Sequence, residues 1–139
     1  MTRYLLDTNV VSELRRARPD PAVLRWFDQA RDAELCLSAL TIGDIRLGIV
    51  RLQRRDPEQA AALAAWLDGL ESGYADRILP VTAAVARRWA ELHAERPLPV
   101  VDALIAATAA EHGATLVTRN VGDLAGVDVP MIDPFVARA

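Results

Sequence analysis

The sequence predicts an α/β fold in which about five parallel strands form one sheet with helices on both faces. Two observations lead to this prediction. Short apolar runs alternate along the 139 residues with longer segments of helical periodicity, an order that is typical of parallel sheets. The apolar runs are also hydrophobic on both faces and few hairpin turns separate them, as expected for strands covered on both sides. The length predicts a single domain, residues 1–139.

Five strands are expected where the chain forms short apolar runs. They are residues 4–6, 35–38, 78–81, 115–118 and 129–132. A helix over residues 9–16 follows the first strand. The next helix, residues 21–31, begins with Asp20 as its N-cap and Pro21 at its first position, where a missing N–H does no harm.

Four more helices are predicted from apolar stripes that follow a capping residue or a proline. Thr41 precedes the stripe Ile42, Ile45 and Ile49; Asp56 and Pro57 open an alanine-rich helix; Thr82 caps the helix of Val85, Trp89 and Leu92; Pro99 lies in the first turn of a helix that ends near His112, before Gly113.

All 16 basic residues are arginines. The absence of lysine excludes mechanisms that need a P-loop, Schiff-base or kinase lysine. Residues 1–55 contain 10 Arg and 7 acids, whereas residues 56–139 contain 6 Arg and 12 acids. The chain is therefore acidic overall but has a basic half, which either faces a nucleic-acid backbone or forms an ordinary solvated surface.

The single cysteine, Cys36, has no partner for an internal disulfide and is expected to be a small buried residue. A reducing cytoplasm suits such a chain. No apolar run approaches the roughly 18 residues of a membrane span, so no membrane association is expected. His93 and His112 lack neighbours at zinc-ligand spacing, which argues against a zinc site.

Three acidic residues occupy places where the predicted fold gathers polar side chains. Asp7 follows the first strand, Asp44 follows the second, and Asp102 interrupts the apolar run 100–105. Ligands of parallel sheets bind beyond the carboxyl ends of the strands, so these acids are candidates for a site. Each also has a structural interpretation: Asp7 caps a helix, Thr41 and Asp44 form a capping box, and Asp102 complements a helix N-terminus.

Considered together, the acids favour a functional interpretation. Carboxylates gathered in one crevice repel one another, so either their pKa values rise or a cation lies between them. A ligand set made only of oxygen suits Mg²⁺ or Mn²⁺ better than zinc. The chemistry that follows is metal-assisted hydrolysis of a phosphodiester. Asn120 and Asp123, after the fourth strand, are weaker candidates because their segment is also ordinary turn chemistry.

Four segments, in this order and spacing, carry a resemblance to a known family over nearly the whole chain. They are residues 5–13 (LLDTNVVSE), 38–48 (SALTIGDIRLG), 101–109 (VDALIAATA) and 116–120 (LVTRN). The chain resembles the PIN-domain ribonucleases, and more narrowly the VapC or FitB-like toxins of type II toxin–antitoxin modules. This resemblance implies a PIN fold and a Mg²⁺ or Mn²⁺ site that cuts RNA.

The resemblance also implies which side chains form the site. Asp7, Asp44 and Asp102 would hold the metal, and Asn120 or Asp123 would complete the catalytic group. Asp44 departs from the family, which usually has glutamate there, and Asn120 stands where many relatives have aspartate. These departures leave open the alternative of a catalytically weakened PIN scaffold that works through protein binding.

Further residues are expected beside the acids. Asn9 and Thr118 would orient ligands or water, while Arg46 and Arg119 would contact phosphate or form salt bridges. The resemblance further implies a cognate antitoxin that places a basic side chain in the acidic crevice. The alanine-rich surface of residues 60–62 and 64–65 is a candidate face for a homodimer or for a partner groove, with ordinary helix packing as the alternative. A haloacid-dehalogenase-like phosphatase fits less well, because that class would need an acid at Asn9 and a lysine.

Overall fold

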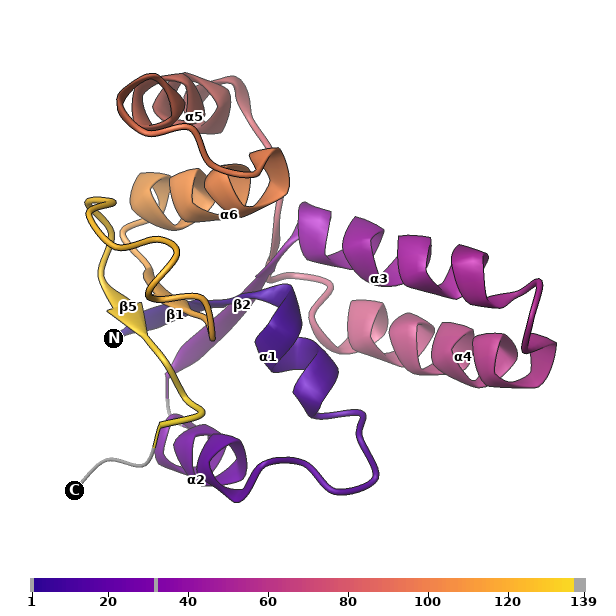
Figure 1. Cartoon of the computed structure of the whole chain (residues 1–139). Coiled ribbons are helices and arrows are strands. Elements are labelled where there is room, and N and C mark those ends of the chain that lie inside the picture. The colour runs from indigo at the N-terminus through magenta and orange to yellow at the C-terminus, as the bar shows by residue number, and fades with distance from the viewer. Residues whose placement is uncertain (1, 32, 137–139) are drawn as a thin grey trace.

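The structure is a computed structural model that describes residues 2–31 and 33–136. Its centre is a five-stranded sheet of order β3-β2-β1-β4-β5, in which every neighbouring pair is parallel (Figure 1). The strands are β1 (Arg3–Leu6), β2 (Glu34–Ser38), β3 (Ile78–Leu79), β4 (Thr115–Val117) and β5 (Met131–Ile132). The predicted parallel α/β sheet is confirmed.

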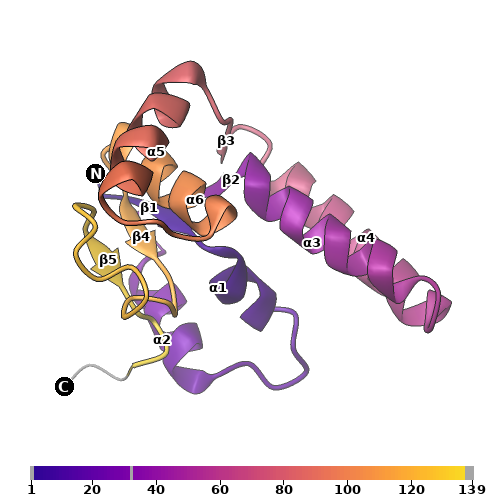
Figure 2. The ribbon, with the colours of Figure 1, turned by 45° about the horizontal axis from the view of Figure 1, so that its top comes forward.

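Six helices connect the strands in the part of the chain that the structure describes. They are α1 (Thr8–Glu13), α2 (Pro21–Gln29), α3 (Ala39–Leu52), α4 (Pro57–Gly73), α5 (Ala83–Glu95) and α6 (Val100–Glu111). Helices α5 and α6 lie together on one side of the sheet, whereas α3 and α4 form a hairpin that projects from the body of the molecule in both views (Figures 1 and 2).

The alternation of side chains along the central strands builds two cores. Leu5 pairs in register with Cys36 and Leu116, and all three face the cluster that contains α6. The next residue, Leu6, belongs to the opposite cluster, which includes residues of α1, α2, α3 and α4. Successive side chains of a strand point to opposite faces, so a strand that is apolar at every position is covered by helices on both sides. This is the arrangement that the sequence predicts.

Several predicted boundaries hold and others shift. Asp20, Asp56 and Thr82 are N-caps whose side chains accept backbone hydrogen bonds, as predicted. The edge strands are shorter than expected, because Pro80 directly follows β3 and Pro130 directly precedes β5, and proline cannot donate to a strand ladder. The strand expected over 115–118 ends at Val117.

The first two helices also end earlier than predicted. Helix α1 stops at Glu13 rather than at residue 16, and α2 stops at Gln29 rather than at residue 31. The side chain of Glu13 is buried and its Oε2 accepts a hydrogen bond from Asp20 N at 2.8 Å. This contact draws the chain into a turn toward α2, which ends α1.

Helix α3 begins before the predicted cap. Ser38, the last residue of β2, is its N-cap, and Ser38 Oγ accepts a hydrogen bond from Leu40 N at 3.0 Å. The capping box proposed for Thr41 and Asp44 is therefore wrong, because both residues lie inside the helix. Asp44 projects from the second turn of α3 and is free of a capping role.

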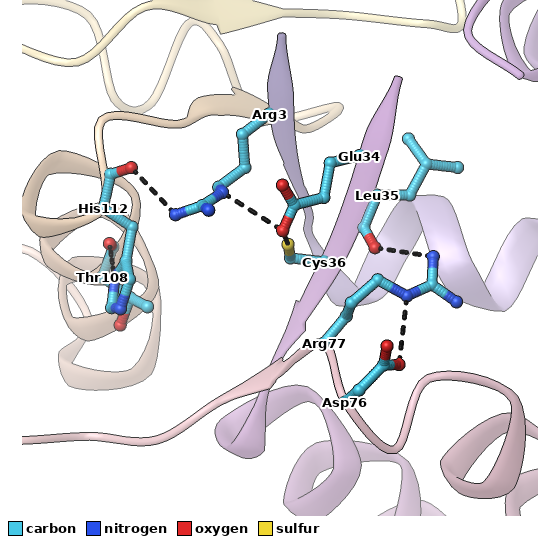
Figure 3. Close-up of polar contacts among 8 residues, drawn as sticks. All are labelled: Arg3, Glu34, Leu35, Cys36, Asp76, Arg77, Thr108 and His112. Atoms are coloured by element: carbon cyan, nitrogen blue, oxygen red, sulfur yellow. Dashed lines mark hydrogen bonds and ion pairs between the residues drawn. The ribbon is translucent and has the colours of Figure 1, made fainter. Parts of the chain in front are cut away.

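A polar network closes the amino ends of the strands, at the edge of the sheet shown in Figure 3. Arg3 Nε lies 3.3 Å from Glu34 Oε1, and Arg3 Nη1 donates to His112 O at 3.4 Å. Arg77 Nη1 donates to the carbonyl of Leu35 at 3.3 Å. These contacts join β1, β2, the end of α6 and the residue before β3.

Cys36 lies within this network and is fully buried, as predicted. Its Sγ donates to Glu34 Oε1 at 3.6 Å. Burial, reinforced by the negative charge of Glu34, raises the pKa of the thiol to about 11. The thiol therefore stays protonated at neutral pH. Among the described residues, no helix is long and apolar enough to cross a membrane.

Candidate functional site

The carboxyl ends of the central strands bring the predicted acids to one edge of the sheet. Asp7 directly follows β1, Asp44 lies on α3 after β2, and Asp102 lies in the first turn of α6. The backbone of Asp7 is tied to the adjacent strand, because Asp7 N donates to Val117 O at 2.9 Å. The site is therefore assembled from three elements that follow or cover neighbouring strands.

Asp7 is both a helix cap and a buried carboxylate. Its Oδ1 accepts a hydrogen bond from Thr8 N at 2.8 Å, and its Oδ2 accepts one from Thr118 Oγ1 at 2.8 Å. Burial raises the pKa of Asp7 above its usual value, and the negative charges of Asp102 and Asp44 raise it further, against the two hydrogen bonds. The capping role and the site role therefore coexist in one side chain.

Asp44 is held by a residue to which the sequence assigned no role. Thr8 Oγ1 lies 3.2 Å from Asp44 Oδ2 and 3.3 Å from Thr41 Oγ1. A hydroxyl has one proton, so the arrangement that satisfies all three groups is Thr41 donating to Thr8 and Thr8 donating to the carboxylate. Thr8 thus contacts two acids: its amide donates to Asp7 and its hydroxyl to Asp44. Its position between Asp7 and Asn9 was the available clue.

Asp102 lies in the first turn of α6, where a helix favours a negative charge, but its other surroundings disfavour that charge. Its pKa is raised, chiefly by burial and then by the charges of Asp44 and Asp123. The direction of this shift agrees with the mutual repulsion that the sequence predicts for the acids. Within residues 2–31 and 33–136, no three His, Cys, Asp or Glu side chains form a ready metal-binding group. The donors nevertheless fit a hard divalent cation, because they are carboxylate oxygens whose repulsion a cation would relieve.

The loop after β4 contributes the remaining predicted side chains. Thr118 Oγ1, which donates to Asp7, accepts a hydrogen bond from Asn120 N at 3.0 Å. Asn9 Oδ1 accepts a hydrogen bond from Arg119 N at 3.1 Å, so Asn9 orients the backbone of this loop. Asp123 is exposed, and its charge acts on Asp102. The structure thus brings Asn120 beside Thr118 and places Asp123 within electrostatic reach of Asp102.

The two candidate arginines differ in their surroundings. The guanidinium of Arg119 lies over the ring of Phe135, 4.2 Å from its centroid, and the residue remains exposed. Arg46 is exposed on α3. Neither arginine forms a salt bridge within the part of the chain that the structure describes. The position of Arg119, next to Asn120, keeps a positive charge at the rim of an acidic site.

A groove of about 420 Å³ leads away from the acids between α1, α3 and α4. Asp44 and Thr8 line it, as do Arg15 and Arg55. Its other walls are Ser12, Ile45, Gly48, Ile49, Leu52, Gln59 and Leu63. The groove therefore combines an apolar wall of isoleucine and leucine side chains with polar residues that include one carboxylate and two guanidinium groups.

Comparisons with known proteins agree with this geometry. The family model of the PIN domain matches residues 4–128. The chain is 34% identical to the VapC ribonuclease Y4jK of Sinorhizobium fredii, over 94% of this chain and 96% of that protein. It is 33% identical to the toxin FitB of Neisseria gonorrhoeae, over 94% of this chain and 97% of FitB.

A solved structure shows the same fold. The crystal structure of FitAcB from Neisseria gonorrhoeae superimposes with a TM-score of 0.84 at 33% identity, covering 95% of this chain and 98% of the other. The family resemblance inferred from the four sequence segments is confirmed. With its parallel sheet and its acids at the carboxyl edge of that sheet, the chain belongs to the PIN-domain family.

Proposed function

We propose that this protein is a divalent-metal-dependent endoribonuclease that acts as the toxin of a toxin–antitoxin pair. The observation that supports the proposal is the position of Asp7, Asp44 and Asp102 at the carboxyl edge of the sheet, where burial and the neighbouring negative charges raise the pKa values of Asp7 and Asp102. Groups with perturbed pKa values cluster at functional sites, and a bound cation would relieve the repulsion between these acids. Similarity to a VapC ribonuclease and to the toxin FitB supports RNA as the substrate.

In this proposal Asp7, Asp44 and Asp102 hold Mg²⁺ or Mn²⁺, and Asn120 or Asp123 completes the site. The bound cation would lower the pKa of a water molecule and offset the negative charge of the phosphodiester. Thr118 and the Thr8 amide keep the carboxylate of Asp7 in a fixed orientation.

The substrate side of the proposal rests on arginines. Arg119 sits beside Asn120, and contact with Phe135 restricts its side chain without neutralising its charge. A guanidinium held in this way contacts a phosphate with less loss of conformational entropy than a free side chain. Arg46 is a second candidate, because it is exposed on α3 and forms no salt bridge among the described residues.

The antitoxin would be recognised by the acids and the groove together. An arginine or lysine from that partner would form charge-assisted hydrogen bonds with the carboxylates that otherwise hold the metal. The apolar walls of the groove, Ile45, Ile49 and Leu63, are suited to an amphipathic helix. Inhibition then follows from occupancy, because metal and basic side chain compete for the same oxygen atoms.

The test is cleavage of a mixed pool of structured RNA by purified protein, free of antitoxin, with Mg²⁺ or Mn²⁺. Controls are EDTA, Asp7→Ala and Asp76→Ala, an exposed acid at the amino edge of the sheet. Cleavage that is lost with EDTA and with Asp7→Ala, but kept with Asp76→Ala, supports the proposal. Cleavage by Asp7→Ala refutes the site. No cleavage by folded wild-type protein favours the weakened scaffold.

A further inference from the structure

Arg96 joins two segments of the chain that carry acids of the site. It is the C-cap of α5, where the chain leaves the helix toward α6. Its Nη2 donates to the carbonyl of Asp123 at 2.6 Å, and its Nη1 donates to the carbonyl of Ala125. One guanidinium therefore holds two carbonyl groups of the loop between β4 and β5, more than 25 residues further along the chain.

The loop has few other attachments near Asp123. Its backbone forms short turns, in which Leu124 N donates to Asn120 O and Ala125 N donates to Gly122 O. Leu124 is buried, whereas the residues on either side of it are exposed. Gly126 has a φ of 91°, which a residue with a side chain rarely adopts. Among the described residues, the packing of Leu124 and the bonds from Arg96 thus anchor this part of the loop to the rest of the molecule.

Electrostatic repulsion between Asp123 and Asp102 acts against the position that Arg96 gives the loop. Asp123 and Asp102 are near enough for the negative charge of one to act on the other. Asp102 belongs to α6, which begins four residues after Arg96, and Asp123 belongs to the loop that Arg96 holds. Donation from a charged guanidinium is among the stronger hydrogen bonds of proteins, so the bonds from Arg96 to the loop backbone hold the loop in place against this repulsion.

We propose that Arg96 is a positioning residue that holds the Asp123 loop against the start of α6, so that Asp102 and Asp123 are presented together to a divalent cation. This inference rests on the proposed function for its cation. Arg96 itself touches neither cation nor RNA; it acts through the backbone of the loop.

The experiment compares Arg96→Ala with Arg88→Ala. Arg96→Ala removes the arginine that caps α5, and Arg88→Ala removes an arginine within that helix. Among the described residues Arg88 pairs with Glu111 and forms no hydrogen bond with the loop. Amide hydrogen exchange of Leu124 and Ala125 is measured by NMR, and Mn²⁺ affinity by calorimetry without RNA. In Arg96→Ala we expect exchange to accelerate at least about tenfold and Mn²⁺ affinity to fall about tenfold, as the loss of charged hydrogen bonds implies.

Cleavage measured against Mn²⁺ concentration separates positioning from a general structural role. For Arg96→Ala the half-maximal concentration should rise while the rate at saturating Mn²⁺ approaches that of the wild type, because excess cation draws the acids together. Arg88→Ala should match the wild type. Unchanged exchange or unchanged Mn²⁺ affinity in Arg96→Ala overturns the inference.

Arg96→Lys keeps the charge and protects the test if the alanine variant fails to fold. A single ammonium group cannot reproduce the fork that spans two carbonyls, so an intermediate loss of Mn²⁺ affinity is expected, and wild-type affinity refutes the role. If the wild-type protein binds Mn²⁺ more tightly than Arg96→Ala does, but cuts no RNA, the proposed nuclease function fails while this inference stands.

Discussion

Thr118→Val removes one hydroxyl from the centre of the site and keeps the shape of the side chain. Thr118 is fully buried, and its Oγ1 donates to Asp7 Oδ2 at 2.8 Å while accepting from Asn120 N at 3.0 Å. A hydrogen bond to a charged group contributes about 1.5–3 kcal/mol and a neutral one about 1 kcal/mol. The variant should therefore lose about 2.5–4 kcal/mol of stability at neutral pH.

The loss should depend on pH with a defined sign. The pKa of Asp7 is higher in the folded protein than in the unfolded chain. The protein therefore loses stability as pH rises from the pKa of Asp7 in the unfolded chain to its pKa in the folded protein. The Thr118 bond limits that loss, because it favours the ionised carboxylate. Without the hydroxyl the pKa of Asp7 rises further and the loss extends over a wider range. The difference between variant and wild type should thus grow as pH rises from about 4.

Urea unfolding followed by tryptophan fluorescence, at a series of pH values from 4 to 8, measures this difference. The matched control is Thr108→Val, another fully buried threonine, whose hydroxyl donates to the carbonyl of Leu104 at 2.8 Å. No carboxylate is involved in that bond, so its cost should be the same at every pH. An equal cost of Thr118→Val at pH 4 and pH 7 would refute the assigned role of the hydroxyl.

Three further variants test the site. Asp7→Asn should abolish cleavage. At pH 7 the variant should unfold at a higher urea concentration than the wild type, because it removes a buried charge from a group whose pKa is raised; at pH 4 no such gain is expected, and lower stability of the variant at pH 7 would contradict this reasoning. Asp44→Glu should cut RNA at least as fast as the wild type, and a large loss would mean that the site is built around the shorter side chain. Phe135→Leu should weaken RNA binding, measured by filter binding in EDTA, because the ring of Phe135 supports the guanidinium of Arg119. In an Arg119→Ala background the same substitution should have no effect.

Much of the fold follows from local patterns in the sequence. The runs around Leu5 and Leu116 are apolar at consecutive positions, and both strands are buried on two faces. Caps such as Asp56 act on residues two or three positions away, so short-range rules suffice. The sequence pattern places the start of α3 too late, because Ser38 belongs to an apolar run that predicts a strand. The structure shows that Ser38 is both the last residue of β2 and the N-cap of α3.

The candidate site was less accessible to such reasoning. Asp7, Asp44 and Asp102 each have an ordinary structural interpretation, and they become candidates for a site only when the predicted sheet places them at one edge. The contacts of Thr8 with Asp44 and of Arg96 with Asp123 join residues 36 and 27 positions apart. Their partners are a side chain on another helix and a backbone carbonyl, neither of which leaves a pattern in the sequence. Non-local hydrogen bonds therefore account for what was missed.

The protonated, fully buried thiol of Cys36 makes this protein a reporter of its own opening. Thiol reagents react with the thiolate, so a chain whose only cysteine lies inside the sheet with a pKa of about 11 is modified almost solely when the sheet opens. The labelling rate, relative to that of the unfolded chain, gives the free energy of opening in native buffer. Substitutions at the catalytic edge can thus be ranked for stability without denaturant and without an introduced probe.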